Sequence, residues 1–385
     1  MAAGAPTFFL TAAEHSGDAL GAALIGALRR RHPEAEFAGV GGERMAGAGC
    51  RLLANPVQRS AMLAGALLTE SRYWWKLLRE IRREMEAVKP AVVVPIDSSF
   101  INLRIAATAK KAGFPVCYYV APQVWASRPW RVRKIRKCVD TLCCMFPFEE
   151  KYFTDRGVHA VYVGHPMFDG PLSEEAPRPP FPPGEPRVAL FPGSRKAEVR
   201  KHMGPMLAVA GEIKKQFPGA VFVIAAPSEE RAAQMKELLR DEFHRPEIRM
   251  GEPEGIIRWA DLVLTKSGTT TLQVARQGKP MVVVFAVPAW QWAAAKPLIL
   301  TKHIAMVNIL AGREVVPEVI PWDGSAGRVS GECMDLLINE PRRVAMVEEL
   351  RRVVEGLWPR EGIPAGERVA TEVLRLAGAG GGENS

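Results

Sequence analysis

The chain has 385 residues, which is too long for one ordinary core and suits two domains. Apolar residues make up 48% and charged residues 24% of it, proportions that are typical of a soluble globular protein. The net charge of +9 favours anionic partners: nucleotides, phosphorylated metabolites, anionic lipid surfaces or nucleic acid.

Cysteine usage indicates a reducing compartment, and the N-terminus and the apolar runs show neither a signal peptide nor a membrane span. Six cysteines show neither Cys-x-x-Cys spacing nor a disulfide framework, so we expect buried free thiols and no structural metal. The first residues lack the basic segment of a signal peptide. The apolar run 281–295 contains a proline and is shorter than the ~18 residues of a membrane-spanning helix. We therefore expect a cytoplasmic protein whose membrane contact, if any, is peripheral.

Strand-like and helix-like runs alternate along the first half of the chain. Helical spacing predicts one helix after the loop 12–18 and a long one over about 71–88. Short apolar runs predict buried strands at 8–10, 37–40, 92–96, 116–120, 142–146 and 161–163. Short buried strands that alternate with helices are typical of a parallel, doubly wound sheet.

The same alternation restarts after a proline-rich segment. Residues 170–186 contain seven prolines, which predicts a stiff, extended linker. Further strands are predicted at 188–190, 221–225, 262–264 and 281–285. We expect an α/β fold of two Rossmann-like domains facing a cleft, with ligands at the carboxyl ends of the strands. Their predicted bounds are 1–169 and 187–360, followed by a C-terminal helix and flexible tail at 361–385.

Two loops of the second domain predict a pocket for a diphosphate. In Gly193-Ser194-Arg195, a glycine, helix-start N–H groups and a guanidinium follow an apolar strand. The loop from Thr265 to Thr271 repeats this arrangement, with hydroxyl groups and the base Lys266 but no acid. One such loop alone is equally consistent with an ordinary turn. No P-loop and no convincing Gly-x-Gly-x-x-Gly is present, which argues against an NTPase or a dehydrogenase.

Polar residues also follow the predicted strands of the first domain. Asp97 ends the strand 92–96, and its carboxylate is a candidate catalytic base or a simple helix cap. His165 lies between glycine and proline, which is poor core material, so we expect it to face the cleft. The segments 14–18 and 120–126 are further candidates, with helix capping and aromatic packing as the simpler explanations.

Eight blocks that occur in this order resemble the lipid-A-disaccharide synthase family along nearly the whole chain. They are Glu14-x-Ser16-Gly17-Asp18-x-Leu20-Gly21-Ala22, Ile96-Asp97 with Asn102-Leu103, Pro122-x-Val124-Trp125-Ala126, Pro147-Phe148-Glu149, Val163-Gly164-His165-Pro166, Pro192-Gly193-Ser194-Arg195-x-x-Glu198, Ser267-Gly268-Thr269-x-Thr271-Leu272, and Asn308-Ile309-Leu310-Ala311-Gly312-Arg313-Glu314. Eight ordered blocks are much more specific than any single one.

The resemblance implies a metal-independent inverting glycosyltransferase of the GT-B fold without a cofactor. It would join UDP-2,3-diacylglucosamine to 2,3-diacylglucosamine 1-phosphate by a β-1′,6 bond, release UDP, and work at the inner face of the cytoplasmic membrane. Inverting transfer needs a base for the acceptor hydroxyl and positive groups for the departing diphosphate. Asp97 is the candidate base, with His165 and Glu14 as alternatives, and Arg195 is the candidate cation.

The remaining predicted site residues fall into two sets. The donor set consists of Gly193, Ser194, Arg195, Ser267, Gly268, Thr269, Thr271, Gln273, Asn308, Arg313 and Glu314. The acceptor or loop set consists of Ser16, Gly17, Asp18, Gln123 and Trp125.

The sequence departs from the family pattern in four places. Ala13 stands where the family usually has glycine, and serines at 98 and 99 occupy the place of a second acid after Asp97. Gln273 replaces an expected acid, and Phe285-Ala286 replaces a Tyr-Arg pair. These departures concern the acceptor, the ribose contact and the activity, and not the fold.

Two other functions remain open at this point. The chain could be another UDP-sugar enzyme of the same architecture, such as an epimerase. It could also be a non-catalytic binder of anionic lipid through the basic run 128–137, where Trp130 is too isolated an aromatic to favour nucleic acid. A homo-oligomer is compatible with either.

The predicted helix at 71–88 also allows two interpretations. Its apolar side chains at 74, 77, 78, 81 and 85 share one face, and the apolar run 61–68 precedes it. Such a helix either docks on the sheet as part of the core or forms a membrane-binding lip.

Overall fold

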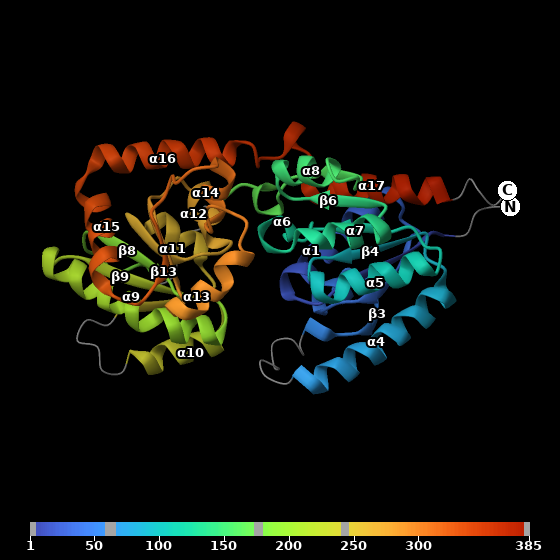
Figure 1. The fold of residues 1–385 in the computed structure, drawn as a ribbon, viewed down its shortest axis with the longest axis horizontal. Helices are drawn as coiled ribbons and strands as arrows, with labels where there is room; N and C mark the ends of the chain where they lie inside the picture. Colours follow the sequence, from blue (N-terminus) through green and yellow to red (C-terminus); the bar gives the residue numbers. More distant parts are fainter. Residues whose placement is uncertain (1–4, 58–66, 173–179, 240–245, 381–385) are drawn as a thin grey trace. The chain divides into compact units, whose positions relative to one another are not determined.

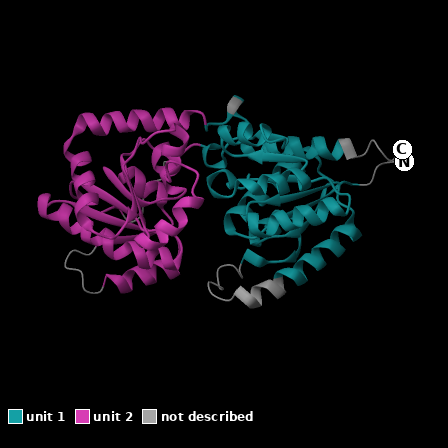
Figure 2. Cartoon of the chain, in the orientation of Figure 1, with its two compact units in different colours: residues 1–170, 357–385 teal, residues 171–356 magenta. Residues whose placement is uncertain are grey.

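The computed structural model describes residues 5–57, 67–172, 180–239 and 246–380, which form helices around two parallel sheets (Figure 1). The chain divides into two compact units (Figure 2): unit 1 comprises 1–170 and 357–385, and unit 2 comprises 171–356. The expected α/β fold with two doubly wound sheets is confirmed.

A seven-stranded parallel sheet forms the centre of unit 1, in the order β3-β2-β1-β4-β5-β6-β7. The order reverses between β1 and β4, and ligands of doubly wound sheets bind at such a reversal, outside the carboxyl ends of the strands. The strands are β1 (Thr7–Ala12), β2 (Glu36–Val40), β3 (Arg51–Ala54), β4 (Val92–Ile96), β5 (Cys117–Tyr119), β6 (Thr141–Cys144) and β7 (Ala160–Tyr162).

Helices cover both faces of this sheet, which is why its central strands are apolar throughout. α1 and α17 pack against each other on one face, whereas α4, α5 and α7 pack together on the other. The helices are α1 (His15–Arg31), α2 (Glu43–Gly47), α4 (Leu67–Val88), α5 (Ser99–Lys111), α6 (Val124–Ser127), α7 (Val132–Cys138), α8 (Pro147–Thr154) and α17 (Ala365–Gly380).

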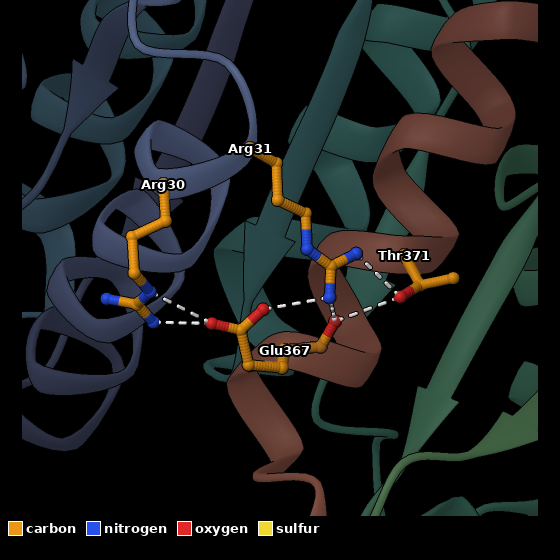
Figure 3. Close-up of polar contacts among 4 residues, drawn as sticks. All are labelled: Arg30, Arg31, Glu367 and Thr371. Carbon is orange, nitrogen blue, oxygen red and sulfur yellow. Dashed lines mark hydrogen bonds and ion pairs between the residues drawn. The ribbon is translucent and has the colours of Figure 1, made fainter.

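The C-terminal helix α17 returns to unit 1 and completes its core. Val369, Ala370 and Val373 are wholly buried in one cluster with residues of α1 and the central strands. At the rim of this contact, Glu367 accepts hydrogen bonds from the guanidinium groups of Arg30 and Arg31 (Figure 3). Unit 1 is therefore built from both ends of the chain.

Unit 2 contains a six-stranded parallel sheet in the order β10-β9-β8-β11-β12-β13. Its order reverses between β8 and β11, as that of unit 1 does between β1 and β4. The strands are β8 (Arg187–Phe191), β9 (Val221–Ala226), β10 (Glu247–Met250), β11 (Leu262–Lys266), β12 (Met281–Ala286) and β13 (Glu318–Trp322). The helices are α9 (Lys196–Gln216), α10 (Glu229–Leu238), α11 (Pro253–Trp259), α12 (Thr270–Arg276), α13 (Ala289–Ala295), α14 (Met306–Ala311), α15 (Ala326–Ile338) and α16 (Glu340–Glu355).

The apolar face of α4 belongs to the core of unit 1. Leu77, Ile81 and Met85 are buried, whereas Lys76 and Arg83 on the opposite face are exposed. The core-helix interpretation therefore holds for this part of α4, and residues 61–66 of the preceding apolar run lie outside the described residues. Among the residues that are described, no helix has the length and apolarity to cross a membrane.

Candidate functional site

A pocket of about 530 Å³ lies in unit 2 at the carboxyl ends of β8, β9 and β11. Its walls come largely from the loops after β8 and β11, the two strands between which the strand order reverses. Six residues of the predicted donor set line it: Gly193, Ser194, Arg195, Gly268, Thr269 and Gln273.

The loop after β8 is held by a carboxylate from the first turn of α9. Oε2 of Glu198 accepts hydrogen bonds from the N–H groups of Ser194 (3.0 Å) and Arg195 (3.2 Å). Gly193 has a φ of +119°, and a Cβ there would come within 2.7 Å of Glu198, so only glycine fits. Two N–H groups of the loop 193–195 thus donate hydrogen bonds to Glu198, while the Arg195 side chain remains 76% exposed.

The loop after β11 is shaped by two hydroxyl groups that do not line the pocket. Ser267 is buried and its hydroxyl donates to the carbonyl of Ile304 at 3.4 Å. Thr271 is wholly buried and its hydroxyl donates to the Gly268 carbonyl at 2.8 Å. These bonds fix the turn from which Thr269 and Gln273 reach the pocket wall.

Lys266 belongs to the second predicted loop and lines the pocket, although it was not among the predicted site residues. It is the last residue of β11, and its Nζ lies 3.0 Å from Oε1 of Glu198. A single lysine at a strand end carries no motif, and its carboxylate partner is far away in the sequence. The signal in the sequence was that Lys266 is the one basic residue of the second predicted loop.

The other three residues of the predicted donor set lie outside this pocket. Asn308 is wholly buried: its Oδ1 accepts the N–H groups of Val315 and Val316, and its Nδ2 donates to Glu318. These bonds fix the chain between α14 and β13. Arg313 is exposed and pairs with Glu349, and Glu314 is exposed. Within unit 2, Asn308 therefore has a structural role, and Arg313 and Glu314 lie on the surface.

In unit 1, Asp97 follows β4 at the reversal of strand order and has an uncommon backbone conformation. Its φ is +57°, that of Ser98 is +40°, and that of Val120 after the neighbouring β5 is +72°. Left-handed geometry costs a non-glycine residue roughly 1–2 kcal/mol. Such conformations persist where surrounding contacts enforce them, and they concentrate at functional sites.

Hydrogen bonds from three directions hold the backbone of Asp97. Its carbonyl accepts from the Tyr118 hydroxyl (2.7 Å) and from Nδ2 of Asn102 (3.0 Å). Its N–H donates to the carbonyl of Tyr119 at 2.9 Å. The side chain is half-exposed, and Oδ2 accepts a hydrogen bond from the Ser16 hydroxyl at 3.3 Å. The fold thus fixes the main chain and leaves the carboxylate accessible.

The loop after β1 and the first turn of α1 contain one exposed and one buried carboxylate. Glu14 and Ser16 are exposed. Asp18 is buried, and its carboxylate accepts the N–H groups of Gly42 (2.7 Å), Arg44 and Met45 (both 3.1 Å). It therefore ties α1 to the start of α2. Gly17 is also buried, and a Cβ there would lie 3.3 Å from the Ile96 carbonyl.

The sequence predicted that His165 faces the cleft, and this prediction is wrong. Aromatic side chains enclose His165 in the structure. It is 6% exposed, its ring centroid lies 5.4 Å from that of Phe146 and 5.9 Å from that of Phe168, and Nδ1 accepts the N–H of Met167. Burial lowers the pKa of His165 to about 4. The imidazole is consequently neutral and packed at neutral pH.

Trp125 is also buried and has a carboxylate partner. Its Nε1 donates to Oε1 of Glu149 at 3.0 Å, while Oε2 of Glu149 accepts the N–H of Phe146. Burial raises the pKa of Glu149 to about 7, against the opposing effect of these hydrogen bonds. Gln123 remains exposed where α6 begins.

The six cysteines are free and buried, as predicted. Burial raises the pKa of Cys50 to about 12, so this thiol is unreactive at neutral pH. Within the described part of the chain, no group of three or more His, Cys, Asp or Glu side chains is arranged to hold a metal ion.

The fold is similar to those of sugar-nucleotide enzymes. One match is a calicheamicin glycosyltransferase (TM-score 0.60, 15% identity, 97% of this chain and 98% of that one covered). Another is a UDP-GlcNAc 2-epimerase from Neisseria meningitidis bound to UDP-GlcNAc (TM-score 0.57, 11% identity, 98% and 100% covered). At these identities the likeness establishes the GT-B fold and does not separate transferases from epimerases.

Sequence comparison distinguishes between a transferase and an epimerase. Residues 8–360 match the family described as lipid-A-disaccharide synthetase. The chain is 36% identical over 373 residues to the lipid-A-disaccharide synthase of Anaeromyxobacter sp. (strain K), with 95% of this chain and 96% of that protein covered. The chain therefore belongs to the lipid-A-disaccharide synthase family of glycosyltransferases.

Proposed function

We propose that the unit 2 pocket holds the UDP part of the donor and that Asp97 accepts the proton of the acceptor hydroxyl. The overall activity is that of the family, lipid-A-disaccharide synthesis. It joins UDP-2,3-diacylglucosamine to 2,3-diacylglucosamine 1-phosphate and releases UDP. The assignment of residues to steps rests on the geometry of each unit.

The observation that carries the donor site is the convergence of two loops on one pocket. The loops after β8 and β11 bring backbone, hydroxyl and guanidinium groups to the same reversal of strand order. A guanidinium binds a phosphate through two parallel hydrogen bonds. The exposed Arg195 contacts Glu198 through Nη1 at 3.6 Å, which leaves its other N–H groups for a phosphate. Half-buried Gln273 lies on the same wall, where it would meet the ribose.

The proposed reaction is a single inverting displacement. The acceptor hydroxyl attacks the anomeric carbon of the donor while its proton passes to the Asp97 carboxylate. The bond between the anomeric carbon and the diphosphate oxygen breaks, and UDP leaves with its bonding electrons. Arg195 would offset the charge that develops on the diphosphate. The half-exposed carboxylate of Asp97 on a rigid backbone suits the role of the base.

The test is UDP release from the two acylated glucosamine substrates. Asp97→Asn is a matched change, because asparagine also tolerates a positive φ. This variant should bind UDP normally and turn over ~10²-fold more slowly or worse. Retained turnover would remove Asp97 from the mechanism and favour Glu14, whose side chain is exposed, over the buried His165.

The phosphate assignment has its own test. Arg195→Ala should weaken UDP binding more than uridine binding, by ~1.5–3 kcal/mol, and Arg195→Lys should restore only part of the difference. Equal losses for the two ligands would place Arg195 outside the phosphate site.

We further propose peripheral contact with anionic lipid through the α7 basic surface. This surface consists of Arg128, Trp130, Arg131, Arg133, Lys134, Arg136, Lys137 and Arg156. Trp130 is 59% exposed and lines, with three of the arginines, a hollow of about 440 Å³. None of these basic side chains has a carboxylate partner among the described residues, so the surface keeps its positive charge. On α4, by contrast, Lys76 and Arg82 pair with glutamates of the same helix.

Vesicle binding distinguishes the two surfaces. Arg133→Gln combined with Arg136→Gln should weaken binding to vesicles that contain phosphatidylglycerol by about 1 kcal/mol per charge. The matched control, Lys76→Gln combined with Arg82→Gln, should bind like the parent. If the control pair weakens binding equally, the effect is one of net charge, and the α7 basic surface is not the contact.

A further inference from the structure

Lys266 and Glu198 form a shielded ion pair in the wall of the unit 2 pocket. Their side chains are 18% and 16% exposed, and Lys266 Nζ lies 3.0 Å from Glu198 Oε1. Removing two charges from water costs free energy that their mutual attraction does not reliably recover. Stability alone therefore does not account for a lysine at this place.

Glu198 is a charged group that organises the loop after β8. Its second oxygen accepts the N–H groups of Ser194 and Arg195. Burial acts to raise the pKa of Glu198, but Lys266 and the loop N–H groups outweigh it, and the net shift is downward. The carboxylate is therefore ionised at neutral pH and presents a full negative charge to both neighbouring cations.

One carboxylate serves two cations. Nη1 of Arg195 lies 3.6 Å from the same Oε1 of Glu198 that Lys266 contacts. The three side chains together carry a net charge of +1 in the pocket wall. An ammonium group has three donors, and Glu198 is the one carboxylate within ion-pair distance of Lys266 among the described residues. Donors and charge thus remain for an anion in the pocket.

We propose that Lys266 is a second phosphate-binding cation of the donor pocket and that Glu198 is the positioning residue that holds Lys266 and Arg195 in place. The proposal rests on the donor site proposed above. Lys266 would contact the diphosphate and, with Arg195, offset the negative charge on the departing UDP. It forms and breaks no covalent bond. The pocket would then neutralise the diphosphate with two side-chain cations that converge from β11 and from the loop after β8.

Calorimetry of UDP and uridine binding tests the role of Lys266. Lys266→Met should weaken UDP by about tenfold or more and uridine less than about twofold, because only UDP carries phosphate. Lys266→Arg should restore part of the affinity for UDP. The matched control is Lys279→Met: Lys279 is also half-buried, but its Nζ donates to the Ala260 carbonyl and it lies outside the pocket lining. That variant should bind both ligands like the parent.

A double variant separates phosphate binding from mere neutralisation of Glu198. If Lys266 only balances that carboxylate, Glu198→Gln combined with Lys266→Met should bind UDP as well as Glu198→Gln alone, in which the loop after β8 is already altered. If Lys266 binds phosphate, the double variant should bind UDP about tenfold more weakly than Glu198→Gln alone. The double variant leaves no shielded unpaired charge, because Arg195 is 76% exposed, and it is measurable even if Lys266→Met alone does not fold.

Equal UDP affinity in the double variant and in Glu198→Gln, or equal weakening of UDP and uridine by Lys266→Met, overturns the proposal. If Arg195→Ala weakens UDP more than uridine but Lys266→Met changes neither affinity, the proposed donor site stands and only Lys266 is removed from it.

Discussion

The hydroxyl of Ser16 donates a hydrogen bond to Oδ2 of Asp97 over 3.3 Å, although the two residues are 81 positions apart in the chain. β1 and β4 are adjacent and parallel, with Ala12 opposite Ile96, so the loops that follow them meet at one edge. The strand order reverses between these two strands. Ser16 is therefore placed to orient the carboxylate that we propose as the base.

Ser16→Ala should slow turnover without changing the affinity for UDP. The hydrogen bond contributes about 0.5–1.5 kcal/mol, so we expect kcat to fall roughly two- to tenfold. His15→Ala is the control, because His15 is the exposed neighbour of Ser16 in the first turn of α1. Steady-state kinetics with both acylated substrates gives the comparison. An unchanged kcat in Ser16→Ala would mean that Asp97 needs no orientation from this hydroxyl.

The central strands could be predicted from sequence, and three edge strands could not. β1, β4, β8 and β11 each contain a continuous apolar run, because both faces of these strands are covered. β3, β10 and β13 lie at sheet edges and contain charged residues or proline, such as Arg51, Glu247 and Pro321. An edge strand needs less apolar sequence, so its pattern does not stand out from that of a loop.

The loops of the candidate site were predictable, but the partners of their side chains were not. Asp97 could be predicted because it is a polar residue directly after an apolar strand, and Gly193 because it is a conformationally flexible residue shortly after another. The contacts of Asp18 with the start of α2, of Trp125 with Glu149 and of Lys266 with Glu198 depend on which strands lie side by side. That order is a tertiary property, and no local pattern encodes it.

Gln273→Glu should tighten the binding of UDP. A carboxylate at this position of the pocket wall would accept hydrogen bonds from both ribose hydroxyls more strongly than an amide does, by about 1 kcal/mol. Calorimetry should therefore show about a fivefold lower Kd. 2′-Deoxy-UDP is the control ligand, and the gain should be smaller for it. Weaker binding of UDP by the variant would show that the nucleotide meets this wall differently.

Glu149 should make unit 1 less stable as the pH rises through the weakly acidic range. Burial raises the pKa of Glu149 to about 7, above its usual value near 4.5, so the folded chain binds this proton more tightly than the unfolded chain. The stabilisation is full below about pH 4.5 and is lost between there and about pH 7, with a size on the order of 3 kcal/mol.

Denaturant unfolding at several pH values checks this, with Glu149→Gln as the comparison. The difference in unfolding free energy between parent and variant should change by this amount over that range, whatever the absolute stability of the variant. His165 also titrates here in the opposite sense, but it is present in both proteins and cancels in the difference. A difference that does not vary with pH would mean that Glu149 has an ordinary pKa.

The docking of α17 on unit 1 should depend more on its buried valines than on its ion pairs. Glu367 accepts hydrogen bonds from Arg30 and Arg31, but the arginine side chains are 67% and 34% exposed, so water screens much of the attraction (Figure 3). Glu367→Ala should therefore cost about 1 kcal/mol. Val373 is wholly buried, and Val373→Ala should cost about 2 kcal/mol through lost apolar burial and the cavity it leaves.

Hydrogen exchange of the amides of α17 measures this local stability directly. Lys151→Ala, which removes an ion pair within α8 of the same unit, is the control and should leave α17 unchanged. Both variants of α17 should exchange faster than the parent, Val373→Ala the more so. A larger effect of Glu367→Ala would mean that the contact of Figure 3, rather than the apolar core beneath it, holds the end of the chain on unit 1.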